Sequence, residues 1–136
     1  MPKGNRLKNN GTKAVFYRTV ETIYDAKVIV PTENGSYSLP RMSHSPNALY
    51  IIKSKSGDYT SLGIYNKYRE IVKEIDVEHG HKSRKKDGTS LSVMKRGVAH
   101  VHNNFGGREN NVRYMTKKEK KLYGKYISFM GGRMEE

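Results

Sequence analysis

Closely spaced apolar residues predict β-structure in the first quarter of the chain. The segment AVFYRTVETIYDAKVIVP is rich in β-branched and aromatic residues, which favour strands. A helical stripe also fits three of its apolar residues, Phe16, Val20 and Ile23. We favour a strand over residues 26–30. Asn34-Gly35 then matches a two-residue hairpin turn, because both positions tolerate a positive φ.

A loop and a second hairpin are predicted next. Residues 38–48 contain two prolines and several small polar residues, which is typical of a loop. The following segment, LYIIKSKSGDYTSLGIY, has an apolar run over 49–52 and a turn through Ser56-Gly57-Asp58. We expect a return strand that ends at Tyr65.

The segment KYREIVKEIDVEHG fits two periodicities. A helix would align Tyr68, Ile71, Val72 and Ile75. A strand would align Ile71, Ile75 and Val77 on one face and would place acidic residues on the other, namely Glu70, Glu74, Asp76 and Glu78. We favour the strand. In a helix, Asp76 and His79 would point away from the site described below.

The pattern of residues 116–132 predicts a C-terminal helix. Thr116 is a suitable N-cap, and Glu119 three residues later completes a capping box. We expect one apolar face, formed by Leu122, Tyr126, Ile127 and Met130, and an end at Gly131-Gly132. The opposite face is rich in lysine, which we interpret first as a solvated surface.

Together these elements predict an α+β fold, in which a twisted antiparallel β-sheet carries the C-terminal helix packed on one face. A chain of 136 residues is of single-domain size. We expect one α+β domain over residues 14–136. Residues 1–13 contain basic residues and no acid, which indicates a flexible basic arm.

Charge and composition narrow the class of partner. Lys and Arg total 26 and Asp and Glu total 13, so the net charge is +13. Such a field favours polyanions, of which nucleic acid is the commonest. The chain contains no cysteine, which excludes disulfides and thiolate metal sites. No apolar run approaches the roughly 18 residues that a bilayer span needs, and we expect no membrane partner.

Four of the five histidines occur in two His-x-His pairs, His79/His81 and His100/His102. In a strand, residues i and i+2 point to the same face, so His100 and His102 would stand side by side. An antiparallel pairing of this strand with the segment that ends near residue 79 would bring carboxylates and imidazoles together. Between the pairs lies a basic loop, residues 80–96, predicted to be irregular.

Three interpretations of the histidines compete. As acid–base catalysts they would need no metal, since imidazole titrates near neutral pH. In RNA cleavage, a base removes the 2′-hydroxyl proton, an acid protonates the leaving 5′-oxygen, and a 2′,3′-cyclic phosphate results. As metal ligands, His-x-His and a third histidine or carboxylate would suit zinc or manganese. The third interpretation is that the pairs are incidental.

The order "MSHSPNALY … YNKYREIVKEIDVEHG … AHVH" resembles a pattern of small toxin-like domains. These domains occur on bacteriophage head-morphogenesis proteins and in bacterial polymorphic toxin systems. The similarity covers residues 43–103, with Ala99 in place of the expected proline and Phe105 three positions after His102. The resemblance implies a ribonuclease or nuclease whose polar pattern falls on Asp76, His79, His100 and His102. It also implies a bacterial cytoplasmic or virion location, with phage structural proteins or an immunity protein as partners.

We therefore predict a nucleic-acid phosphodiesterase, favouring a metal-independent endoribonuclease of a phage or mobile element. Its catalytic residues would be His100 and His102, assisted by His79 and Asp76. RNA is the favoured substrate. Nucleic acid would be held by Lys82, Arg84, Lys85, Lys86, Arg96, Arg108 and Arg113, with Tyr114 stacking on a base. The alternatives are a non-catalytic basic virion protein that binds nucleic acid and a metal-dependent nuclease that uses the histidines.

Overall fold

A computed structural model describes the backbone of residues 5–9, 13–32, 37–77, 81–84, 90–94, 97–103 and 112–135. Side chains are described for residues 17–32, 37–77, 97–103 and 112–135. The strands of the main sheet are β1 (Asn5–Asn9), β2 (Lys13–Ile23), β3 (Ala26–Pro31), β4 (Leu49–Lys53), β5 (Tyr59–Tyr65), β6 (Ile71–Asp76), β9 (His100–Asn103) and β10 (Val112–Tyr114). Two further strands, β7 (His81–Arg84) and β8 (Ser90–Met94), pair with each other, and α1 (Lys117–Phe129) follows.

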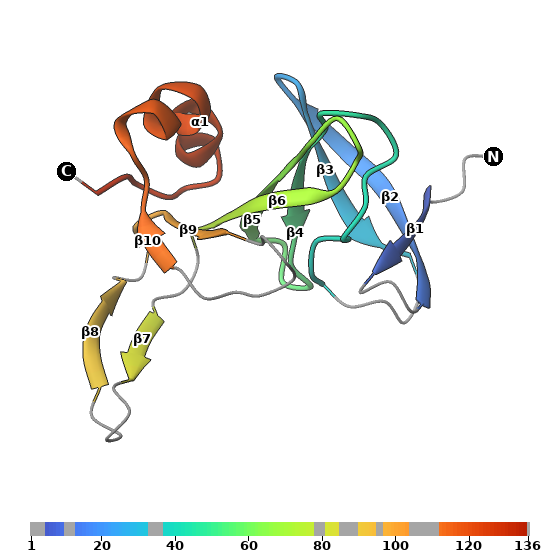
Figure 1. The fold of residues 1–136 in the computed structure, drawn as a ribbon. Helices are drawn as coiled ribbons and strands as arrows, with labels where there is room; N and C mark the ends of the chain where they lie inside the picture. The colour runs from blue at the N-terminus through green and yellow to red at the C-terminus, as the bar shows by residue number, and fades with distance from the viewer. Residues whose placement is uncertain are drawn as a thin grey trace.

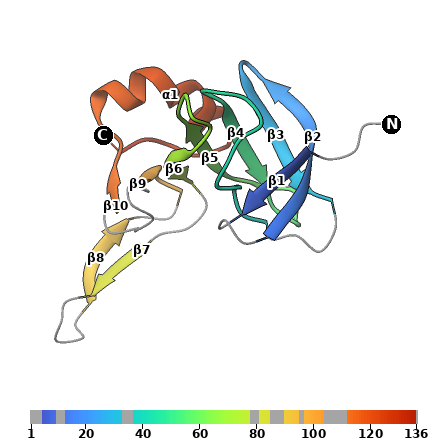
Figure 2. The ribbon, with the colours of Figure 1, turned by 45° about the vertical axis from the view of Figure 1, so that its right-hand side comes forward.

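The main sheet has the order β1-β2-β3-β4-β5-β6-β9-β10 within the described residues. Its neighbours pair antiparallel, except that β3 and β4 are parallel. Figure 1 shows a strongly twisted sheet with α1 on the β10 side and β1 on the other. The view of Figure 2 agrees and shows the β7–β8 ribbon projecting from the rest. The predicted α+β class, a largely antiparallel sheet with one C-terminal helix, is confirmed.

Strands β3 and β4 are parallel neighbours, so a hairpin does not connect them. The Asn34-Gly35 turn lies outside the described residues, but β4 cannot be the second strand of a hairpin with β3. Parallel neighbours need a crossover connection, and residues 37–48 belong to it. Two tyrosines hold this segment on the sheet, because Tyr17 donates to the Ser38 carbonyl and Tyr65 donates to the Pro40 carbonyl.

Each face of the sheet buries its own apolar cluster. On the first, called the helix face, α1 packs against strand residues that include Val28, Ile51, Leu62, Ile75 and Val101. On the second, called the loop face, Leu39 of the crossover packs against residues that include Tyr17, Ile29, Tyr50, Ile52 and Tyr65. Because both faces are covered, β4 carries an apolar run, as expected of a strand without a wet side.

The predicted strand over residues 68–78 is confirmed by β6, with one local difference. Ile75 and Val77 belong to the helix-face cluster, but Ile71 belongs to the loop-face cluster. The register between β5 and β6 shifts between Ile64 and Tyr65, so that one extra residue enters β6. A bulge of this kind moves the preceding side chain to the other face, which a regular alternation from Ile71 to Val77 cannot anticipate.

The C-terminal helix begins and ends where the sequence predicts. Thr116 accepts a hydrogen bond from the Glu119 amide, and the Glu119 carboxylate accepts one from the Thr116 amide. Gly131, at φ 84°, follows the last turn, as a helix end requires. Leu122 differs from the prediction. It is 50% exposed, because it lies at the margin of the face that Tyr126, Ile127 and Met130 bury.

Two segments predicted as irregular contain strands. Residues 5–9 of the expected flexible arm form β1 and pair antiparallel with β2. Within the expected basic loop, β7 and β8 pair antiparallel. Strands β1 and β7 contain few apolar residues, so the hydrophobic pattern did not indicate either pair, and none of the three strands was predicted. Among the described residues, no helix is both long and apolar enough to cross a membrane.

Candidate functional site

Strands β6 and β9 pair antiparallel, which confirms the predicted meeting of carboxylates and imidazoles. The register places Asp76 opposite His100 and Glu74 opposite His102. Residues directly opposite each other project to the same face of a sheet. One row of such partners crosses five strands, namely Ile52, Ser61, Asp76, His100 and Tyr114. Because Ile52 is buried on the loop face, the whole row lies on that face.

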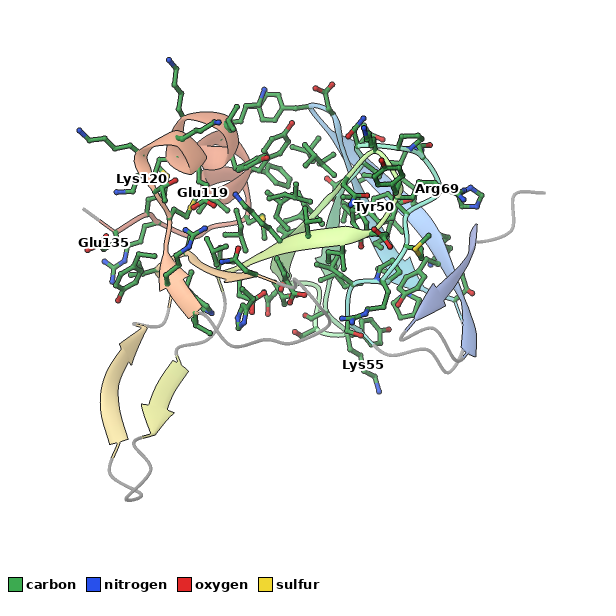
Figure 3. All side chains as sticks on the ribbon, viewed as in Figure 1. Tyr50, Lys55, Arg69, Glu119, Lys120 and Glu135 are labelled. Carbon is green, nitrogen blue, oxygen red and sulfur yellow. The ribbon has the colours of Figure 1, made fainter. Side chains whose placement is uncertain are left out.

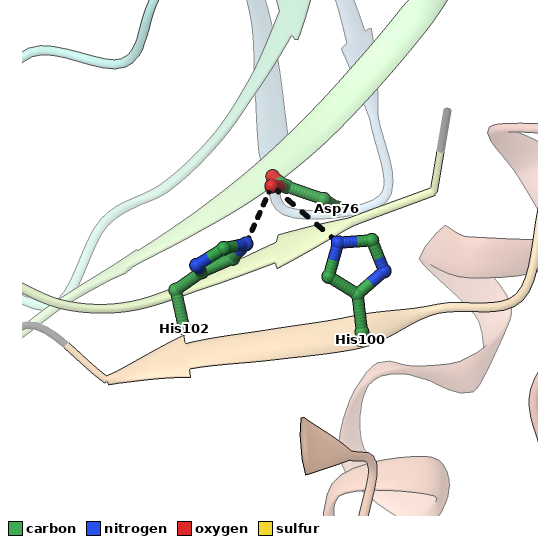
Figure 4. A group of neighbouring side chains, drawn as sticks. All are labelled: Asp76, His100 and His102. Atoms are coloured by element: carbon green, nitrogen blue, oxygen red, sulfur yellow. Dashed lines mark ion pairs between the residues drawn. The ribbon is translucent and has the colours of Figure 1, made fainter. Parts of the chain in front are cut away.

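The Asp76 carboxylate is the centre of the cluster (Figure 4). Its Oδ2 atom lies 2.9 Å from Nε2 of His102 and 3.8 Å from Nε2 of His100. The centroids of the two imidazole rings are 5.3 Å apart. The 2.9 Å contact is an ion pair, and because a carboxylate only accepts, the proton of His102 would reside on Nε2 in this pair. The second ring nitrogen of His102, Nδ1, is then the one that can accept a proton.

Two further groups orient the cluster. The Ser61 hydroxyl donates to Asp76 Oδ1, so that the two carboxylate oxygens have different partners. The Nδ1 atom of His100 lies 3.2 Å from the Val98 carbonyl oxygen. A carbonyl oxygen accepts, so Nδ1 carries a proton in this contact and Nε2 is directed towards Asp76. Three neighbouring strands, β5, β6 and β9, thus fix the carboxylate and both rings.

The three central side chains are buried. His100 is 0% exposed, and His102 and Asp76 are each 3% exposed. Burial by itself raises the pKa of the Asp76 carboxyl, but hydrogen bonds with His102, Ser61 and Glu74 outweigh this effect and lower the pKa to about 2. Asp76 is therefore ionised at neutral pH, in an interior where an isolated charge is costly. The adjacent imidazoles are the groups that compensate it.

Ser61 and Glu74 also belong to the cluster. The sequence predicted that Glu74 shares a strand face with Asp76, but it did not predict Ser61. Ser61 carried no recognisable signal. It is a small polar residue in a strand with buried Leu62 and Ile64, and its role depends on the register between β5 and β6. That register is set by tertiary pairing, which local sequence does not reveal.

Arg113 lies away from this cluster. Its register partner is Val101, a helix-face residue, so Arg113 is on the opposite face from His100. Its Nη1 and Nη2 atoms donate to Glu119 at 2.6 and 2.8 Å, and Lys73 donates to the same carboxylate at 2.7 Å. Figure 3 shows Glu119 between α1 and β10. This geometry gives Arg113 a role in docking the helix, and the predicted phosphate contact of Arg113 stays a prediction, on the face opposite His100.

Tyr114 is the predicted nucleic-acid residue that the structure brings to the site. It is the register partner of His100 on β10 and is half-buried. The remaining predicted residues are not placed. His79, Lys85, Lys86, Arg96 and Arg108 lie outside the described residues, and so do the side chains of Lys82 and Arg84.

Asp76, His100 and His102 lie close enough together to bind a metal ion. Each offers one ligand atom, and the three atoms all lie within 4.8 Å of one another. The same cluster contains a histidine held by an ionised carboxylate, which is the arrangement used in general acid–base catalysis. Comparisons with protein-family models, curated proteins and solved structures give no match for this chain. The chemistry of the site must therefore be inferred from its own residues.

Proposed function

We propose that this chain is a metal-independent endoribonuclease-like phosphodiesterase whose reaction takes place at Asp76, His100 and His102. The observation that carries the proposal is the 2.9 Å contact between Asp76 Oδ2 and His102 Nε2, with the ring of His100 5.3 Å from that of His102. An imidazole oriented by a carboxylate thus lies next to a second imidazole on the same strand. Cleavage of RNA without metal needs two such groups, one to remove a proton and one to supply it.

His102 fits the role of general base. Asp76 fixes its Nε2–H, so Nδ1 would accept the proton of the attacking 2′-hydroxyl. The ionised carboxylate would then stabilise the imidazolium that forms. Ser61 helps by holding the other carboxylate oxygen. Asp76 is thus a positioning residue in this proposal, since it acts through His102.

His100 fits the role of general acid. Its Nδ1 contact with the Val98 carbonyl would leave Nε2 to carry the transferable proton. That proton would pass to the 5′-oxygen as its bond to phosphorus breaks, while the 2′-oxygen forms the new bond. The products would be a 2′,3′-cyclic phosphate and a 5′-hydroxyl, and no water is consumed in this step.

The choice of substrate rests on charge and on the resemblance of residues 43–103 to toxin-like domains of phage and bacterial proteins. A net charge of +13 favours association with a polyanion. Tyr114 shares the face of His100, where an aromatic ring could stack on a base. Because the central side chains are buried, cleavage also requires the protein to open locally over the cluster.

The test compares the intact chain with His100→Ala and His102→Ala on single-stranded RNA, on matched DNA and on RNA with one 2′-deoxy position. The proposal predicts RNA cleavage in EDTA, no cleavage of DNA, and protection at the 2′-deoxy position. Each variant should lose about 100-fold or more in rate. His44→Ala is the matched control, because His44 is exposed on the crossover loop. Thermal unfolding shows whether the variants remain folded.

Two results would overturn the proposal. Cleavage of RNA that disappears in EDTA would assign the reaction to a metal-dependent nuclease. Tight RNA binding without cleavage would identify a basic binding protein instead. That second function has its own support in the exposed lysines of α1, which are Lys117, Lys118, Lys121 and Lys125.

A further inference from the structure

We infer that Asp76, His100 and His102 form a binding site for a divalent transition-metal ion of the zinc type. Binding of the ion does not depend on the proposed nuclease activity. The ion would, however, occupy the atoms that acid–base cleavage requires, and it would therefore inhibit the proposed reaction.

The separations of the ligand atoms are close to those of a zinc site. Zinc lies about 2.0–2.2 Å from nitrogen and oxygen ligands in tetrahedral sites, which places neighbouring ligand atoms about 3.3 Å apart. Here the Asp76 Oδ2 atom is 2.9 Å from His102 Nε2 and 3.8 Å from His100 Nε2. These values lie on either side of the required separation. The three ligand atoms all lie within 4.8 Å of one another, so a change of at most about 1.5 Å in any one separation would complete the three-ligand set.

Two of the three ligand residues are held by hydrogen bonds of the kind found around metal ligands. Histidines that bind metals usually donate their other ring N–H to a carbonyl or carboxylate, and metal-binding carboxylates are themselves hydrogen-bonded. His100 meets this condition through the Val98 carbonyl, 3.2 Å from Nδ1. Asp76 meets it through the Ser61 hydroxyl on Oδ1. Both contacts leave Nε2 of His100 and Oδ2 of Asp76 as the atoms that face each other, and Figure 4 shows the ion pairs of both histidines meeting at the Asp76 carboxylate.

The ligand atoms of His100 and Asp76 face each other in the protein interior. With Nδ1 of His100 donating to Val98, the lone pair of a neutral ring points from Nε2 towards Asp76 Oδ2. In this neutral form of His100, Nε2 and Asp76 Oδ2, which lie 3.8 Å apart, would both donate electron pairs to one cation. The protein presents this pair at 0% and 5% side-chain exposure, where the low dielectric strengthens the attraction of a cation.

The donor set selects the class of ion. Two imidazoles and one carboxylate suit zinc, cobalt or nickel, whereas magnesium prefers oxygen ligands and retains its waters. With three protein ligands, a fourth position remains for water or an anion. On binding, the proton that His102 donates to Asp76 would be released to solvent, and Nε2 would coordinate the ion.

The experiment titrates the full chain, freed of metal, with Zn²⁺ by calorimetry and with Co²⁺ by visible absorption, in the absence of nucleic acid. The proposal predicts saturable binding that His102→Ala and His100→Ala abolish and that His44→Ala leaves unchanged. It also predicts no displacement by Mg²⁺ and a four-coordinate Co²⁺ spectrum. Zinc binding that persists in His102→Ala, or no binding by the intact chain, would contradict it.

Ser61→Ala covers the case in which the ligand variants do not fold. It keeps all three donors and removes only the hydroxyl that holds Asp76. Loss of an outer-shell partner should weaken zinc binding about 10-fold or more, and unchanged affinity in folded Ser61→Ala would contradict the site. The nuclease proposal is tested separately, by RNA cleavage in EDTA. If zinc binds and RNA is not cleaved, the nuclease proposal fails alone. If RNA is cleaved and zinc does not bind, the ion site fails alone.

Discussion

Asp76 and His100 face each other as register partners on the antiparallel strands β6 and β9, with 3.8 Å between Oδ2 and Nε2. Twenty-three intervening residues separate these two strand positions in the sequence. Pairing of the strands brings both partners, and His102 beside them, onto the loop face. The helix α1 packs on the other face, so the polar cluster lies on the face opposite the helix, beside the apolar cluster of the loop face.

The Glu119 carboxylate should be the principal polar anchor of α1. It is 3% exposed, binds Arg113 and Lys73, and completes the capping box with Thr116. We expect Glu119→Gln to lower the free energy of unfolding by about 2–4 kcal/mol, because it leaves two cations without their buried partner. Urea unfolding measures this change. The exposed Glu135 provides the control, and Glu135→Gln should change stability by less than about 0.5 kcal/mol.

The same carboxylate should make stability depend on pH in acid. Hydrogen bonds from Arg113, together with those from Lys73 and Thr116, hold the pKa of Glu119 well below its ordinary value of 4.5, against the opposing effect of burial. A group with a lowered folded pKa stabilises the protein above its unfolded pKa, and this contribution is lost as the pH falls towards the folded pKa. The stability difference between wild type and Glu119→Gln should therefore be full at neutral pH and shrink below about pH 4.5. A difference that stays constant down to pH 2.5 would refute this origin.

Histidine reactivity should follow burial. Among the histidines whose side chains are described, His44 is exposed, whereas His100 and His102 are buried. Diethyl pyrocarbonate should modify His44 rapidly and the two buried histidines only after local opening. Mass spectrometry of peptides after timed exposure gives the rates for each site. Equal rates for His44 and His102 would contradict the buried cluster.

The end of α1 should tolerate no side chain at Gly132. A Cβ atom there would lie 2.7 Å from Cγ1 and 2.8 Å from Cβ of Val77, the residue after Asp76. We expect Gly132→Ala to destabilise the protein by about 1–3 kcal/mol through overpacking. Ser128→Ala, at an exposed helix position, serves as the control and should stay within about 0.5 kcal/mol. Equal midpoints of thermal unfolding for the two variants would contradict the close packing of the helix end on β6.

Local sequence predicted the elements that carry strong periodicity or capping signals. Thr116 and Glu119 predicted the start of α1, and the alternation of Glu74, Ile75, Asp76 and Val77 predicted β6. The spacing of His100 and His102 placed both on one face. These signals are local, since each depends on residues within one strand or one helical turn.

The features that were missed depend on contacts between distant segments. The role of Ser61 follows from the register of β5 with β6, and the position of Ile71 follows from the bulge in that pair. Arg113 was predicted as a phosphate ligand because it is basic, and nothing in its local sequence indicated an ion pair with Glu119. Its pairing with Glu119 depends on which face of β10 it occupies, and that face is decided by the register with β9.

The cleavage of single-stranded RNA in EDTA by wild type, His102→Ala and His44→Ala tests the central claim most directly. We predict that wild type and His44→Ala produce 2′,3′-cyclic phosphate ends at equal rates. Folded His102→Ala should be slower by about 100-fold or more. Equal cleavage by all three proteins, or RNA binding without any cleavage by wild type, would contradict the assignment of this cluster as an acid–base active site.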